Sequence, residues 1–318
     1  MSDSWPRPGR GTAPERVVVL GGTGFLGRNL CVSLTAAGYA VTAVARRPPA
    51  VSLGCRFRPF DVVVGGAAGL ARLLADERAT VLVNAAGAVW RGSDSDLTKA
   101  NVELVGTVLE ALASCPAAPR LIQLGTVYEY GNPAGPAELR ESSPAAPVNH
   151  YGRGKLLATE AVLASRARAV VLRLSTSVGP GMPPESLLGM TVRQLADGAA
   201  VIELPALRGR GDFLDVRDVG AAVLAAVRTP AASGVFNIAR GELVPVADVV
   251  RQLIRLSGVP ATVADRGGGQ SRRAAGFEAR RIVPDAAKQV LGWEPRRSLT
   301  EALRSLWQET SSERRRQA

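Results

Sequence analysis

Tyr151 and Lys155 are the residues of this sequence whose types and spacing could do acid–base chemistry. They stand four residues apart, so a helix through this segment would put both side chains on one face. A free phenol, with a pKa of about 10, is a poor acid–base catalyst near neutrality. A neighbouring ammonium stabilises the phenolate and lowers that pKa. The same spacing also occurs in ordinary helices, so its meaning depends on the scaffold around it.

A glycine-rich turn near the N-terminus predicts a phosphate site. Gly21, Gly24 and Gly27 form a GxxGxxG pattern between the apolar run 17–20 and a helical pattern that begins near Leu26. Glycine permits a tight turn, a close backbone approach to a pyrophosphate and close packing of the helix on the strand. The free N–H groups at the helix start would then face the phosphates. A purely structural turn is the alternative, and the position between a strand and a helix favours a dinucleotide site.

The end of the second strand distinguishes the two nicotinamide dinucleotides. An acidic residue there would bind the ribose 2′-hydroxyl of NAD. The sequence instead has Arg46 and Arg47 after the apolar run 41–44, with no carboxylate at this turn. Guanidinium groups can bind a 2′-phosphate bidentately, so the pattern favours NADP over NAD. The alternative is that both arginines are solvated loop residues.

These groups need a scaffold, and the alternation of apolar runs with helical patterns predicts a doubly wound parallel α/β sheet of the Rossmann type. The later chain is more mixed and predicts a smaller C-terminal α/β lobe. The expected strands cover 17–20, 41–44, 81–83, 121–124 and 170–174, and the expected helices cover 26–37, 69–75, 97–112 and 156–164.

The chain is expected to divide into a leader, two lobes and a tail. The parts are a disordered leader at 1–15, a dinucleotide-binding domain at 16–175 with a returning segment at about 212–230, a substrate-binding lobe at 176–211 and 231–309, and a flexible tail at 310–318. The glycine- and arginine-rich stretch 265–276 is expected to be a flexible loop.

Composition argues against several classes of protein. The net charge is +11, mostly from arginines spread along the chain, and no nucleic-acid recognition motif accompanies it. We therefore expect no nucleic-acid partner, but a surface that attracts phosphorylated small molecules. No uninterrupted apolar run of about 18 residues is present, so no membrane span is expected. Three scattered cysteines and one histidine, His150, predict reduced thiols in the cytoplasm and no metal site.

Further motifs give the chain a specific family resemblance. They are NAAG at 84–87, E-x-x-P at 141–144, LR at 172–173 before VGP at 178–180, DFLDVRDV at 212–219 and LGWEP at 291–295. Together with GxxGxxG and YxxxK, they make the sequence resemble the extended short-chain dehydrogenase/reductase family. This is the NAD-dependent epimerase/dehydratase group, which acts largely on nucleotide sugars. The resemblance covers about residues 16–307.

The resemblance implies roles for the residues at matching positions. Thr126 would hydrogen-bond the substrate oxygen, Lys155 would bind the nicotinamide ribose, and Asn101 would support the active-site helix. The implied catalytic residues are Thr126, Tyr151, Lys155 and Asn101. The implied cofactor-binding residues are Gly21, Thr23, Gly24, Phe25, Leu26, Gly27, Arg46, Arg47, Asp61, Val62, Asn84, Ala85, Ala86, Tyr151 and Lys155. The implied substrate-binding residues are Thr126, Tyr128, Thr176, Arg208 and Arg210, with Arg280 or Arg281 as further candidate clamps.

The family's chemistry implies reduction of a ketone by NADPH, with Tyr151 donating the proton to the carbonyl oxygen. The best-fitting substrate is a nucleotide-linked 4-keto-6-deoxyhexose reduced at C4, in deoxysugar or antibiotic biosynthesis. The resemblance is therefore greatest to nucleotide-sugar 4-ketoreductases. A dehydratase is not expected, because Val127 and Tyr128 replace the Asp-Glu pair that follows the catalytic threonine in those enzymes.

Two other functions stay open at this point. One is a nucleotide-sugar epimerase with tightly bound NAD, and the other is a non-catalytic NADP-binding regulatory protein. Family relatives are often dimers that pack through the helices corresponding to those of Asn101 and Tyr151. The apolar run 104–112 is compatible with such a homodimer.

Overall fold

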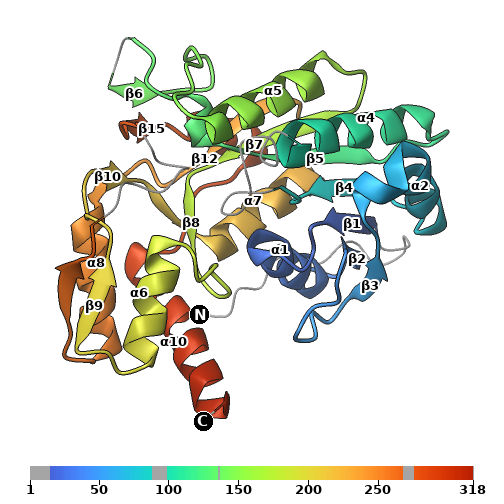
Figure 1. Cartoon of the computed structure of the whole chain (residues 1–318). Helices are drawn as coiled ribbons and strands as arrows, with labels where there is room; N and C mark the ends of the chain where they lie inside the picture. Colours follow the sequence, from blue (N-terminus) through green and yellow to red (C-terminus); the bar gives the residue numbers. More distant parts are fainter. Residues whose placement is uncertain (1–14, 88–98, 135–136, 268–275, 318) are drawn as a thin grey trace.

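The computed structural model describes residues 15–87, 99–134, 137–267 and 276–317 (Figure 1). Nearly all of the expected leader at 1–15 and the centre of the expected loop at 265–276 lie outside these residues. Among the described residues, one large sheet is accompanied by several two-stranded sheets.

The large sheet has seven strands in the order β12-β7-β5-β4-β1-β2-β3, and all neighbours in it are parallel. The order reverses direction between β1 and β4, so the doubly wound Rossmann fold expected from the sequence is confirmed. The strands are β1 Arg16–Leu20, β2 Ala40–Ala45, β3 Arg56–Pro59, β4 Val81–Asn84, β5 Arg120–Thr126, β7 Ala169–Leu174 and β12 Gly234–Ile238.

Helices cover both faces of this sheet, which explains the continuous apolar runs of its strands (Figure 1). Along β1, Val17 and Val19 share one core with α1 and α7, whereas Val18 and Leu20 share the other core with α2, α4 and α5. The alternation follows from the two-residue repeat of a strand. The helices are α1 Phe25–Ala36, α2 Val62–Asp76, α4 Leu104–Ser114, α5 His150–Ala164 and α7 Val216–Arg228.

Three of these helices differ from the expected ranges. Helix α5 begins at His150 rather than at residue 156, because the Asn149 side chain caps it. Helix α2 begins at Val62 rather than near residue 69, because the Asp61 carboxylate accepts the Val63 N–H at 2.9 Å and caps the helix. Gly66, with φ of 59°, then kinks it. Helix α4 is preceded by a π-helical turn, η1 (Lys99–Glu103), at the start of the expected helix 97–112.

The smaller lobe is built from short paired strands and three longer helices. Its core contains Leu188, Val249 and Leu303, one from each of α6, α8 and α10. The strand pairs are β8 (Thr176–Val178) with β11 (Phe213–Asp215), β9 (Val201–Leu204) with β14 (Thr262–Asp265), β10 (Arg210–Gly211) with β13 (Val244–Pro245), and β6 (Glu138–Leu139) with β15 (Arg281–Ile282). These helices are α6 Leu187–Ala196, α8 Val246–Ser257 and α10 Leu299–Gln317. The short helix α9 (Asp285–Leu291) packs instead in the core of the large sheet.

The chain returns to the large sheet over a longer stretch than the 212–230 expected. Strand β12 pairs with β7 as an edge strand of that sheet. Leu291 and Trp293 are buried in the same core as β1 and α1. The later chain therefore contributes an edge strand, β12, and the short helix after β15 to the large sheet and its core.

The polar tail expected at 310–318 is instead helical as far as Gln317. Helix α10 is held at this end by an ion pair between Arg314 and Asp197, and Ser311 is buried. Glu309 also accepts hydrogen bonds from Arg28 and the Gly181 N–H. These tertiary contacts stabilise a segment whose own composition is polar.

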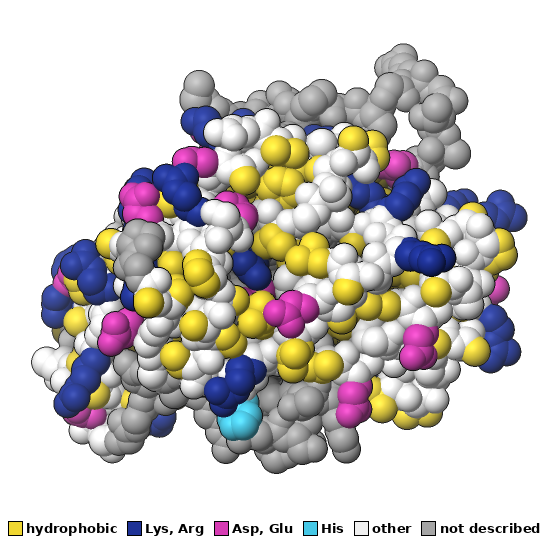
Figure 2. Space-filling model, turned by 90° about the horizontal axis from the view of Figure 1, so that it is seen from above, with side chains coloured by type: hydrophobic (Ala, Val, Ile, Leu, Met, Phe, Trp, Pro, Cys, Tyr) yellow, Lys and Arg dark blue, Asp and Glu magenta, His cyan; other side chains and the backbone are white. Residues whose placement is uncertain are grey.

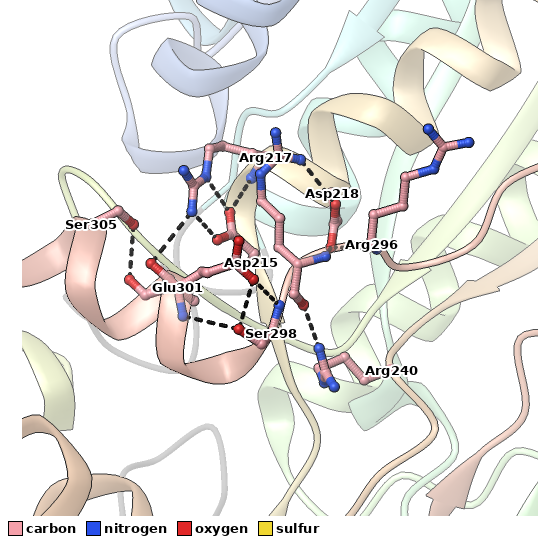
Figure 3. Close-up of polar contacts among 10 residues, drawn as sticks. Asp215, Arg217, Asp218, Arg240, Arg296, Ser298, Glu301 and Ser305 are labelled. Carbon is pink, nitrogen blue, oxygen red and sulfur yellow. Dashed lines mark hydrogen bonds and ion pairs between the residues drawn. The ribbon is translucent and has the colours of Figure 1, made fainter. Parts of the chain in front are cut away.

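A polar junction joins the start of α7 to the segment before α10 (Figure 3). Asp215 caps α7 by accepting the Arg217 N–H at 2.8 Å. The buried Asp218 carboxylate accepts the backbone N–H groups of Arg296 at 3.0 Å and Arg297 at 2.9 Å. Each carboxylate therefore satisfies backbone donors that would otherwise be unpaired beside the core.

Candidate active site

The glycine-rich loop lies against the end of β4, at the point where the strand order reverses. Gly21 has φ of 71°, and a Cβ added there would lie 2.8 Å from the Ala86 Cα. A Cβ added at Gly27 would lie 2.1 Å from the Gly21 carbonyl oxygen. The Gly22 N–H donates to the Val44 oxygen at 3.1 Å, which ties the loop to the end of β2. The two glycines are thus required by close backbone approach.

The start of α1 fits an anion. Gly24 is its N-cap residue and provides no side-chain cap, and the first turn contains no acidic residue. The N–H groups of this turn are therefore available to a phosphate, at the positive end of the helix dipole. Gly24 is exposed, and Thr23, Phe25 and Leu26 beside it are partly exposed. The loop has the backbone geometry that a dinucleotide pyrophosphate needs.

Residues expected to line the cofactor follow the ends of neighbouring strands. Arg46 and Arg47 are exposed directly after β2. Asn84 is fully buried at the end of β4, where its amide donates to Gln123 Oε1 at 2.9 Å and its oxygen accepts the Ala86 N–H at 3.1 Å. These bonds fix the backbone of Ala85 and Ala86 against the glycine-rich loop. Asp61 and Val62, also expected here, form the cap and first residue of α2.

Tyr151 and Lys155 lie one turn apart in α5, on its buried face. The helix begins where the Asn149 side chain accepts the Gly152 N–H at 2.9 Å. A Cβ added at Gly152 would lie 2.5 Å from the Tyr128 carbonyl oxygen, so this helix start is pressed against the turn that follows β5. The Lys155 ammonium donates to the Leu124 oxygen of β5 at 3.3 Å.

Thr126 ends β5 and caps that turn, η2 (Val127–Glu129). Its hydroxyl accepts the Tyr128 N–H at 3.4 Å. The Tyr128 ring meets the Tyr151 ring edge-on, with centroids 6.1 Å apart. Thr126, Tyr128, Tyr151 and Lys155 are therefore brought together by the contact of α5 with the end of β5. Asn101 is buried in η1, which also packs against α5.

Sequence reasoning missed a buried ion pair beneath these residues. Glu129 is 0% exposed, and its carboxylate accepts the Thr126 N–H at 2.8 Å and the Arg173 Nε–H at 2.7 Å. Burial raises the pKa of Glu129, and the charge of Arg173 opposes that shift. Burial lowers the pKa of Lys155, and the charge of Glu129 opposes that shift. The signal that could have found Glu129 is the capping-box pattern T-x-x-E at 126–129.

The motif glutamate Glu141 and the aromatic residues extend this buried network into the later chain. The Tyr130 hydroxyl donates to Asn237 Oδ1 at 2.8 Å, and the Asn237 N–H donates to Glu141 at 2.8 Å. The Phe277 ring packs on the Tyr128 ring with centroids 4.7 Å apart. A residue of the later chain thus contacts the aromatic side chain beside Tyr151.

The expected substrate residues of the smaller lobe lie mainly in loops and short strands. Thr176 begins β8 and is partly exposed. Arg208 is exposed, and Arg210 donates to the Leu243 oxygen at 2.8 Å. Arg281 pairs with Glu138 and donates to the Gly241 oxygen. Arg210 and Arg281 therefore already have structural partners.

The described part of the chain also limits other kinds of site. No group of three or more metal-binding side chains is found among the described residues. Nor does any helix among them have the length and apolarity needed to cross a membrane.

The sequence is similar to several known proteins. A sequence model of the NAD dependent epimerase/dehydratase family matches residues 17–239. A dTDP-6-deoxy-L-talose 4-dehydrogenase (NAD(P)(+)) from Kitasatospora kifunensis is 43% identical, over 93% of this chain and 96% of its own. A UDP-glucose 4-epimerase from Azospirillum brasilense is 27% identical, over 89% of this chain and 88% of its own.

Solved structures show the same fold. A putative epimerase from Burkholderia cenocepacia aligns with a TM-score of 0.82 and 27% identity, over 94% of this chain and 99% of its own. The protein RMD from Pseudomonas aeruginosa, solved with NADPH, aligns with a TM-score of 0.77 and 20% identity, over 93% of this chain and 99% of its own.

Proposed function

The chain belongs to the NAD-dependent epimerase/dehydratase family and is an NAD(P)-dependent oxidoreductase of the extended short-chain type, and from this membership we propose that it is a nucleotide-sugar 4-ketoreductase. Its substrate is a nucleotide-linked 4-keto-6-deoxyhexose, and its reductant is NADPH. The observation that carries the proposal is the meeting of Thr126, Tyr151 and Lys155 at the end of β5 in a chain 43% identical to a 6-deoxysugar 4-dehydrogenase. Oxidation of a C4 hydroxyl and reduction of a C4 ketone are one reaction in two directions.

Each residue has a distinct role in this reaction. Tyr151 donates its phenolic proton to the carbonyl oxygen, and the Thr126 hydroxyl hydrogen-bonds the same oxygen. The Lys155 ammonium stabilises the phenolate that Tyr151 leaves behind, because the two side chains share one face of α5. A bound dihydronicotinamide supplies the hydride to the carbonyl carbon.

The cofactor preference is part of the proposal. Arg46 and Arg47 are exposed after β2, and no carboxylate occupies that turn. This supports binding of a 2′-phosphate, hence NADP rather than NAD. The 43% identical relative is named for use of either cofactor, so the preference needs a direct measurement.

The test incubates the purified protein with NADPH and a dTDP-4-keto-6-deoxyhexose. Turnover is monitored as the loss of NADPH absorbance, and the sugar product is then analysed. We expect Tyr151→Phe to lower kcat about 100- to 10,000-fold, because it removes the proton donor. Tyr39→Phe is the matched control, since Tyr39 belongs to the core under α1 and β2. Equal rates for Tyr151→Phe and wild type would refute the assignment. Conversion of UDP-glucose with retained NAD would instead identify an epimerase.

We also propose a homodimer through α4 and α5. Leu157 and Leu163 are about half exposed on α5. Figure 2, which looks down on the molecule from above the view of Figure 1, shows hydrophobic side chains spread across the middle of this face among separate charged ones. Measurement of the mass in solution tests this, and Leu157→Lys with Leu163→Lys would give a monomer.

A further inference from the structure

Glu129 is a fully buried carboxylate directly beneath the proposed reaction centre, and the mechanism above gives it no role. Buried carboxylates are costly unless they are paired and hydrogen-bonded. Both oxygens of Glu129 are used: Oε1 accepts the Thr126 N–H at 2.8 Å and Oε2 accepts the Arg173 Nε–H at 2.7 Å. The carboxylate is therefore held from two sides, by the turn after β5 and by β7.

The surrounding chain leaves just enough room for this carboxylate. A Cβ added at Gly125 would lie 2.6 Å from Glu129 Oε1, so the residue before Thr126 must be small. On the other side, the Arg173 guanidinium lies over the Tyr130 ring, 4.6 Å from its centroid. Thr126 thus sits on a turn whose backbone is fixed by an ion pair rather than by apolar packing alone.

The same carboxylate lies beside the strand that Lys155 contacts. The Lys155 ammonium is buried and donates to the Leu124 oxygen at 3.3 Å, and Leu124 directly precedes Gly125, against which Glu129 Oε1 lies. Burial lowers the pKa of Lys155, and the charge of Glu129 opposes that shift. Other titratable or charged groups lie on the elements packed against α5. Arg173 and Tyr130 are buried close to Glu129, and the Tyr128 ring is buried against the Tyr151 ring. Arg120 is buried at the start of β5, where it donates to the Ala226 and Ala232 oxygens, whereas Glu103 and Glu110 are exposed.

We propose that Glu129 is a positioning residue for the reaction: its carboxylate holds the Thr126 backbone in place and sets a negative charge beside Gly125, next to the Leu124 oxygen that accepts the Lys155 ammonium. This inference rests on the proposed function, because it concerns the same Thr126, Tyr151 and Lys155. Arg173 orients Glu129 through its Nε–H, so that one carboxylate serves both neighbours.

Two variants separate this role from a merely structural one. Glu129→Gln leaves Arg173 buried without its carboxylate, and this variant is expected to be unstable. The double variant Glu129→Gln with Arg173→Gln keeps two amides that can bond to each other and leaves no buried unpaired charge. We expect the double variant to fold, with kcat reduced about 100-fold and KM changed less than about 3-fold, because a small misplacement of reacting groups mainly lowers kcat. The alkaline limb of its kcat profile should move to lower pH, because Lys155 loses its proton more easily.

A second readout does not need turnover. Without Glu129, burial of a protonated Lys155 costs more. The double variant should therefore lose stability relative to wild type at about pH 7, and this loss should shrink as pH rises towards the unfolded lysine pKa of about 10.4. Lys155→Met in both backgrounds should abolish the pH dependence of the difference.

The outcomes are distinguishable. Lack of wild-type turnover on keto-sugar nucleotides would refute the proposed function, and the stability series would then decide the role of Glu129 alone. The charge role would be overturned if the double variant and wild type differed in stability by the same amount at about pH 7 and at about pH 10. It would also be overturned if Lys155→Met left the pH dependence of that difference unchanged. A double variant with wild-type kcat and an unshifted pH profile would overturn the inference as a whole.

Discussion

Replacing Gly27 with alanine should destabilise the whole fold rather than only weaken cofactor binding. The added Cβ would lie 2.1 Å from the Gly21 carbonyl oxygen and 2.7 Å from its carbonyl carbon. That backbone has little freedom to move away, because Gly21 has φ of 71° and itself abuts Ala86. Overpacking usually costs about 1–3 kcal/mol, and a rigid backbone partner puts this case near about 3 kcal/mol.

Urea unfolding of the purified variant measures this cost. With a slope of about 3 kcal/mol per M, the midpoint should fall by about 1 M. Gly24→Ala is the matched control in the same loop, because its nearest added contact is 3.3 Å and its φ of −75° suits alanine. Its unfolding free energy should stay within about 1 kcal/mol of wild type. Its NADP binding should weaken, because a Cβ at Gly24 would stand between the backbone and the pyrophosphate. A Cβ added at Gly106 on α4 meets nothing within 4 Å. Gly106→Ala should therefore raise the free energy of unfolding by about 0.4–1 kcal/mol. An unchanged midpoint for Gly27→Ala would refute the packing argument.

Three further changes follow from the same structure. Arg46→Ala with Arg47→Ala should raise KM for NADPH about 10- to 100-fold and leave KM for NADH unchanged, in steady-state assays with both cofactors; parallel increases for both would contradict a 2′-phosphate site. Asp218→Ala should lower the free energy of unfolding by about 3 kcal/mol, because two backbone N–H groups lose their acceptor, whereas Asp285→Ala, at an exposed ion pair, should change it by less than about 1 kcal/mol. Lys155→Met should be more stable than wild type at about pH 7 and should lose that advantage towards about pH 10. Burial lowers the folded-state pKa of Lys155, so the free-energy cost of burying its charged form fades as pH rises. Thermal unfolding of both proteins across this pH range checks it.

Patterns that depend on neighbours in sequence predicted the doubly wound fold and the tight glycine-rich turn after β1. The apolar runs of β1, β4 and β5 are continuous because both faces of the sheet are covered, and that signal is local. The family resemblance implied that Thr126 and Tyr151 act on one substrate oxygen, and the structure brings α5 against the end of β5. Strand β3 was missed, because its sequence RFRP alternates polar and apolar residues instead of forming a continuous apolar run. Its arginines form ion pairs with Glu77 and Asp76 at the edge of the sheet.

Features made by distant residues could not be predicted in this way. Glu129 and Arg173 are 44 residues apart, and neither is unusual alone. The helical end of α10 depends on Arg28, Asp197 and Gly181, which lie far from it in sequence. The placement of β12 also depends on the free edge of β7, which becomes visible only when the sheet is assembled.

The return of the later chain to the large sheet affects how the protein can be made. A ribosome that has just released residue 175 has delivered six of the seven strands, yet α1 still lacks α7, and β7 still lacks β12. Trp293 is synthesised later still. It is buried in the same core, and its indole N–H donates to the Asp218 backbone carbonyl oxygen at 3.0 Å. The nascent sheet therefore keeps an apolar face uncovered until Trp293 has been synthesised, and protection by a chaperone would matter most during that interval.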